Sequence, residues 1–97
     1  MDYSIIENRI NEKIKLLLSS FNSQFLSSNI TYEILLKRDN ENDTKNYNSE
    51  IEIVFNKEGN FIDIIEFFIY RNGELSIKED NLLNELYTDI EGILSMT

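Results

Sequence analysis

The sequence predicts an α+β protein with an N-terminal helix, a four-stranded antiparallel meander and a C-terminal helix, both helices lying on one sheet face. Two observations support this prediction. Apolar residues recur every three or four positions over residues 4–27 and 80–94, as in amphipathic helices. Between these segments, apolar and polar residues alternate in short runs separated by glycine-containing turns at 57–60 and 72–73. A chain of 97 residues is expected to form a single domain spanning 1–97.

The N-terminal segment predicts one continuous helix over residues 4–27. Its apolar stripe consists of Ile6, Ile10, Ile14, Leu17, Phe21 and Phe25. A polar run at 27–29 ends this helix. Alternation over residues 30–37 then predicts the first strand, whose apolar side consists of Ile30, Tyr32, Ile34 and Leu36.

Residues 38–49 are almost wholly polar and predict a long surface loop. Four acids in and just after this segment have the spacing of ligands in a calcium-binding loop, namely Asp39, Glu41, Asp43 and Glu50. Thr44 stands where the tight turn of such a loop requires glycine, and strands rather than helices flank the segment. A solvated loop is therefore favoured over a calcium site, and no metal or cofactor is expected.

Three more strands are predicted at residues 50–55, 61–71 and 74–78. Asn72-Gly73 is typical of a type I′ hairpin turn, which requires a strand on each side. The C-terminal helix is expected to begin with Asp80 as its N-cap. A capping box from Ser76 to Glu79 is the alternative, and it would shorten the fourth strand.

The turn at residues 58–59 predicts the register of the second and third strands, with Phe55 opposite Ile62. This register places an apolar strip and three acids on the sheet face away from the helices: Ile65, Phe67, Ile69, Glu50, Glu52 and Asp63. An exposed apolar strip with an acidic rim is typical of a protein-binding surface. Two alternatives are a homodimer interface and a β-bulge near Glu66 that turns the strip inward.

The composition argues against an enzyme. The chain has no cysteine and no histidine, which excludes thiolate nucleophiles and removes the most common general base. Carboxylate pairs are available at Glu50, Glu52 and Asp63 and at Glu85 and Asp89, but nothing indicates the dry pocket that acid–base chemistry needs. Glycine-rich phosphate loops are also absent.

The charge of the chain is unevenly distributed. Residues 1–38 hold four acidic and five basic residues, whereas residues 39–97 hold fourteen acidic and four basic residues. This distribution repels nucleic acid and attracts basic proteins. The carboxylates of Glu85 and Asp89, one helical turn apart, either aid solubility or help to steer a cationic partner. The expected partner-binding residues are Glu50, Glu52, Asp63, Ile65, Phe67, Ile69, Glu85 and Asp89.

These features predict a small bacterial or phage inhibitor that binds and neutralises a basic protein such as a nuclease-type toxin, as an immunity protein does. At the level of topology alone, the predicted layout is similar to immunity proteins that flank a small antiparallel sheet with helices. The alternatives are a phage-encoded DNA mimic of the anti-restriction or anti-CRISPR type and a self-associating structural domain. The first nine residues are partly charged and no apolar run has signal-peptide length, so a cytoplasmic location without membrane contact is expected.

Overall fold

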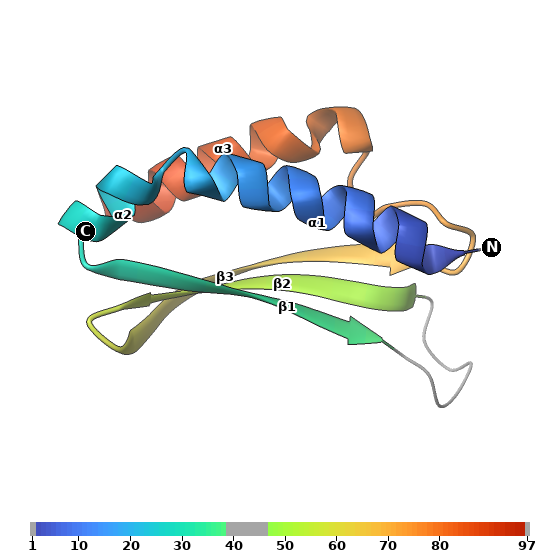
Figure 1. Cartoon of the computed structure of the whole chain (residues 1–97), viewed down its shortest axis with the longest axis horizontal. Coiled ribbons are helices and arrows are strands. Elements are labelled where there is room, and N and C mark those ends of the chain that lie inside the picture. The colour runs from blue at the N-terminus through green and yellow to red at the C-terminus, as the bar shows by residue number, and fades with distance from the viewer. Residues whose placement is uncertain (1, 39–46, 97) are drawn as a thin grey trace.

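The computed structural model describes residues 2–38 and 47–96, which form two layers (Figure 1). One layer is an antiparallel sheet of β1 (Ile30–Arg38), β2 (Tyr47–Lys57) and β3 (Asn60–Tyr70), with β2 in the centre. The other layer contains α1 (Tyr3–Ser19), α2 (Asn22–Ser27) and α3 (Glu79–Ser95), which lie on one side of the sheet. The α+β class and the shared side of the helices agree with the sequence, but the prediction of four strands is wrong.

The predicted N-terminal helix is interrupted after Ser19. Helix α1 begins beyond Asp2, whose carboxylate accepts a hydrogen bond from the Ser4 N–H (3.1 Å). At its other end, the Ser19 and Ser20 hydroxyls donate to backbone carbonyls one turn earlier, at distances of 2.8 and 2.6 Å. Such side-chain bonds compete with helical hydrogen bonding and favour a turn. The break before α2 still leaves Phe21 buried in the core.

The predicted fourth strand is reduced to a single bridge between Ile69 and Leu75. In the turn before it, Gly73 has φ +87°, whereas Asn72 does not have a positive φ, so the turn is not type I′. The Gly73 N–H instead donates to the Tyr70 carbonyl (2.9 Å). This wider turn shifts Leu75 from its predicted partner Tyr70 to Ile69, and the chain then leaves the sheet towards α3.

Helix α3 begins at Glu79 with Lys78 as its N-cap, so neither predicted start is correct. The Glu79 carboxylate pairs with Arg9 (2.8 Å) and Lys13 (2.5 Å) of α1. An acid in the first turn also interacts favourably with the helix dipole. These contacts join the N-terminus of α3 to α1. Of the described helices, none combines the length and apolar character that crossing a membrane requires.

The hairpin between β2 and β3 contains a bulge that the predicted register lacks. Glu58 and Gly59 have φ values of 52° and 84°, as a type I′ turn requires, and Asn56 opposes Phe61. Phe55 then opposes Asp63, because Ile62 is the extra residue of a β-bulge. Every later residue of β3 is therefore displaced by one position and changes face.

This shift moves the predicted exposed strip into the core. Ile65, Phe67 and Ile69 are 8%, 5% and 0% exposed and lie on the helix-covered face. They oppose the buried residues Ile53, Ile51 and Ser49 of β2. The predictions of an apolar docking strip and of a dimer interface built from it are wrong. The bulge expected as an alternative near Glu66 is present, but at Ile62.

Candidate functional site

The face of the sheet away from the helices is the largest part of the fold that no described helix covers (Figure 1). Strand alternation and register assign its members. Its apolar and aromatic residues include Leu35, Tyr47, Val54, Phe61, Ile64 and Phe68, and its charged residues are Glu33, Lys37, Glu50, Glu52 and Glu66. We call this surface the uncovered face. It has four carboxylates against one ammonium group among the described residues.

Three of these carboxylates lie close together. Glu52 of β2 directly opposes Glu66 of β3, and carboxylate oxygens of Glu50, Glu52 and Glu66 lie within 4.8 Å of one another. The backbone explains the proximity. The Phe68 N–H donates to the Ser76 hydroxyl and its carbonyl accepts from the Ser76 N–H, so neither group is bonded to β2. Phe68 and Glu66 therefore form non-hydrogen-bonded pairs with their β2 partners, and the side chains of such pairs approach most closely.

Glu52 is the most enclosed member of this cluster, with 6% of its surface exposed. It forms an ion pair with Lys37 of β1, which lies on the same face. The hydrogen bond to Glu52, followed by the attraction of its charge, raises the pKa of the Lys37 ammonium group. Lys37 therefore stays protonated beside Glu52.

The three glutamates are the described group best placed to contact a cation. Their oxygens are close enough to reach one divalent ion, but Ca²⁺ needs several more oxygen ligands and Lys37 already engages Glu52. An ammonium or guanidinium group of a protein needs no such coordination shell. The predicted calcium-loop residues Asp39, Glu41 and Asp43 lie outside the described residues.

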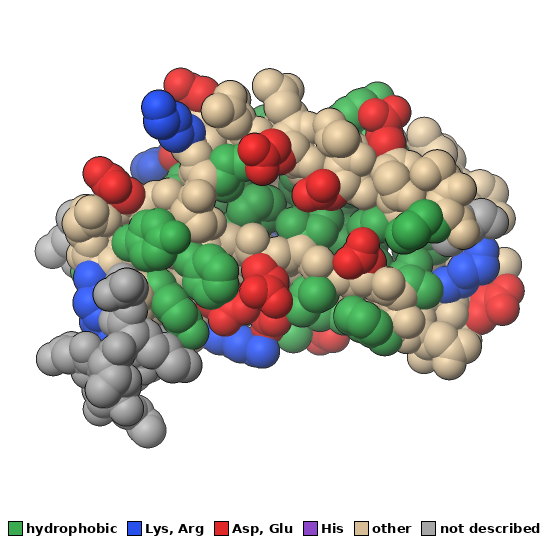
Figure 2. Space-filling view, turned by 180° about the vertical axis from the view of Figure 1, so that it is seen from behind, with side chains coloured by type: hydrophobic (Ala, Val, Ile, Leu, Met, Phe, Trp, Pro, Cys, Tyr) green, Lys and Arg blue, Asp and Glu red, His purple; other side chains and the backbone are tan. Residues whose placement is uncertain are grey.

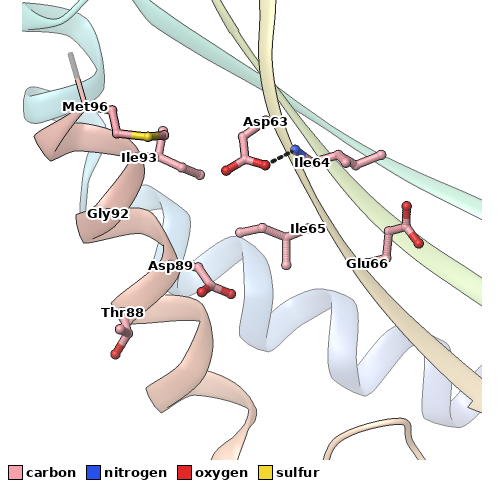
Figure 3. Close-up of a pocket in the computed structure, with 9 residues that line it drawn as sticks. All are labelled: Asp63, Ile64, Ile65, Glu66, Thr88, Asp89, Gly92, Ile93 and Met96. Atoms are coloured by element: carbon pink, nitrogen blue, oxygen red, sulfur yellow. Dashed lines mark hydrogen bonds between the residues drawn. The ribbon is translucent and has the colours of Figure 1, made fainter.

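A second acidic pair lies on the neighbouring side of the molecule. Asp63 of β3 and Asp89 of α3 point towards an open groove of about 500 Å³ between these elements, whereas Glu66 points away from it (Figure 3). Asp63 accepts a hydrogen bond from the Ile64 N–H (2.8 Å). Partial burial, and secondarily the Asp63 charge, raises the pKa of the Asp89 carboxyl. Figure 2 shows acidic side chains dispersed among hydrophobic ones over this side.

The structure thus divides the predicted binding residues into four groups. Glu50 and Glu52 meet on the uncovered face, and Asp63 and Asp89 meet at the groove. Glu85 is exposed one helical turn before Asp89 and does not line the groove. The remaining three are in the core and cannot reach a partner: Ile65, Phe67 and Ile69.

Sequence reasoning missed Glu66 because the predicted register put it on the core face. The charge of Glu66 was the available signal against that register, since burying an unpaired glutamate in the core costs a large free energy. Moving the strand by one position resolves that conflict and exposes Glu66.

Comparison of the chain with protein-family models, with curated proteins and with solved structures gives no match.

Proposed function

We propose that this chain is a small acidic inhibitor that binds and neutralises a basic protein, such as a nuclease-type toxin, in the cytoplasm, and that it is not an enzyme. The observation that carries the proposal is the direct opposition of Glu52 and Glu66 on the uncovered face, with Glu50 beside them.

This opposition is unfavourable for the isolated chain. Like charges directly opposite each other in a sheet destabilise it by about 0.2–1 kcal/mol, and here Glu52 and Glu66 are such a pair, with Lys37 bound to Glu52. Natural sequences depart from such local rules mainly where function requires it. Lysine or arginine side chains of a bound partner would relieve the repulsion between Glu52 and Glu66.

The surroundings of the cluster suit burial against another protein. Val54, Ile64 and Phe68 are half-buried side chains on the same face, and the Phe68 ring lies 4.9 Å from that of Tyr47. An interface with apolar side chains at its centre and charges around them provides both affinity and specificity. The net charge of −9 would speed the encounter with a cationic partner.

The test is capture of the partner from the host, followed by a functional assay. The baits are the wild-type chain, the double variant Glu50→Gln/Glu66→Gln and the control Glu12→Gln/Glu91→Gln. The control removes two exposed acids from the helices, so both variants have the same net charge. We expect the wild type and the control to retain a basic protein that the uncovered-face variant loses. Adding the wild-type chain should then suppress the activity of that protein.

Two results would overturn the proposal: equal retention by all three baits, or a captured protein whose activity the chain leaves unchanged. Suppression of a restriction or CRISPR nuclease through its DNA channel would instead assign the DNA-mimic alternative. In that case affinity should fall steeply with salt, because the occluded channel is cationic.

A further inference from the structure

The outer edge of β3 has backbone groups available for strand pairing. Phe68 directs its N–H to the Ser76 hydroxyl (3.0 Å), and its carbonyl accepts from the Ser76 N–H (2.9 Å). Both groups therefore point away from β2. Because strand geometry repeats every two residues, Ile64 and Glu66 direct their backbone groups to the same side.

Segment 74–77 covers only the end of this edge. The bridge at Leu75 and the bonds of Ser76 occupy the edge near Phe68. Nearer the start of β3, the Ile64 N–H donates to the carboxylate of its neighbour Asp63. Among residues 2–38 and 47–96, no acceptor is found for the Glu66 N–H. An edge of this kind accepts an added strand from another chain.

The groove between β3 and α3 runs beside this open edge (Figure 3). Ile65, Ile93 and Met96 provide apolar lining, and Gly92 has no side chain to narrow it. A Cβ added at Gly92 would meet no atom within 4 Å, so the groove is open at that point. No lysine or arginine is among the described residues that line it.

The two carboxylates of the groove both point into it, that of Asp63 from β3 and that of Asp89 from α3 (Figure 3). Partial burial and, second, repulsion by the Asp63 carboxylate raise the pKa of Asp89. A cation inserted between them would relieve this repulsion. A side chain that suits this groove has an alkyl stem, which would contact Ile93 and Met96, and a planar end group with several hydrogen-bond donors.

We propose that an extended peptide segment of a partner protein adds to the open edge of β3 and places an arginine side chain between Asp63 and Asp89. This inference goes beyond the proposed function, because it concerns a different surface and a defined ligand. The backbone of the peptide would pair with the N–H and carbonyl of Glu66 and with the carbonyl of Ile64, whose N–H stays bonded to Asp63, and the guanidinium group would donate to both carboxylates.

The test titrates the full, isotope-labelled chain with a short capped peptide of alternating threonine and valine that carries one central arginine, followed by NMR. Two matched peptides accompany it: one with neutral citrulline in place of arginine, and one with N-methylated backbone amides. The protein variants are Asp63→Asn and Asp89→Asn, with Glu85→Gln as the control one turn outside the groove. Asparagine at 63 can still accept the Ile64 N–H, so this variant preserves the local fold.

We expect saturable shifts at residues 64–66 and 89–93, with each Asp→Asn variant weakening binding about tenfold and Glu85→Gln leaving it unchanged. Equal binding of the citrulline peptide would overturn the role of arginine. Equal binding of the N-methylated peptide would overturn strand addition. Shifts confined to the uncovered face, or none at millimolar peptide, would overturn the site itself. None of these results bears on whether Glu50 and Glu66 bind a basic protein.

Discussion

Replacing Phe67 by alanine, with Phe68→Ala as its matched control, tests the direction in which β3 points its side chains. The two residues are adjacent and identical, but Phe67 is buried under the helices and Phe68 is half-buried on the uncovered face. Removing a fully buried phenylalanine side chain costs about 3–5 kcal/mol. That is a large share of the roughly 5–15 kcal/mol by which a small domain is stable.

Phe68→Ala should be much milder. Its ring contacts Tyr47 at a centroid distance of 4.9 Å, and losing such a pair with partial burial costs about 1–2 kcal/mol. The two variants should thus differ by about 2–3 kcal/mol in unfolding free energy. With a urea m-value of about 1–3 kcal/mol/M, the midpoint of Phe67→Ala should lie roughly 1 M or more below that of Phe68→Ala. Equal midpoints, or a lower one for Phe68→Ala, would refute the bulged register.

Three further predictions concern charge and backbone conformation. Glu66→Gln should raise the unfolding free energy by about 0.2–1 kcal/mol, measured by urea denaturation at neutral pH, because it removes a like charge opposite Glu52; destabilisation would count against that repulsion. Hydrogen bonds from Arg9 and then from Lys13 hold the pKa of the Glu79 carboxyl in the folded protein below its ordinary value. The ionised carboxylate therefore stabilises the fold fully at a pH above the pKa of the unfolded chain, and this stabilisation is lost as the pH falls through the pKa of the folded protein. The midpoints of wild type and Glu79→Gln should therefore converge in acid, and a gap that widens there would contradict the ion pair. Gly92→Ala should raise the melting temperature, because alanine is more stable than glycine inside a helix by about 0.5–1 kcal/mol. Gly59→Ala should lower the melting temperature, because Gly59 has φ +84°. The reverse order would contradict the helical conformation of Gly92 and the positive φ of Gly59.

The amphipathic helices and the turn at Glu58-Gly59 were predictable because each depends on local chemistry. Apolar spacing alone locates α1 and α3, and the glycine at 59 indicates the hairpin. The ends of these elements were less predictable. The start of α3 at Glu79 depends on ion pairs with α1, which is distant in the sequence.

The alternation of apolar residues in β3 does not assign its faces, and the charge of Glu66 is the one local signal against the predicted assignment. Apolar residues occupy both odd and even positions from Ile62 to Ile69, so alternation does not select a face. The bulge at Ile62 selects it, and nothing in the adjacent residues marks a bulge. Once the bulge is included, the candidate site changes from an apolar strip to a carboxylate cluster around Glu52 and Glu66.

We propose that the carboxylates of the uncovered face bind a basic protein. The most direct measurement of this binding is the calorimetric affinity of the captured partner for the wild type, for Glu50→Gln/Glu66→Gln and for the charge-matched control Glu12→Gln/Glu91→Gln. The uncovered-face variant should bind at least about tenfold more weakly, while the control stays close to wild type. Equal weakening by both variants would mean that only net charge matters, and it would contradict a specific role for this face.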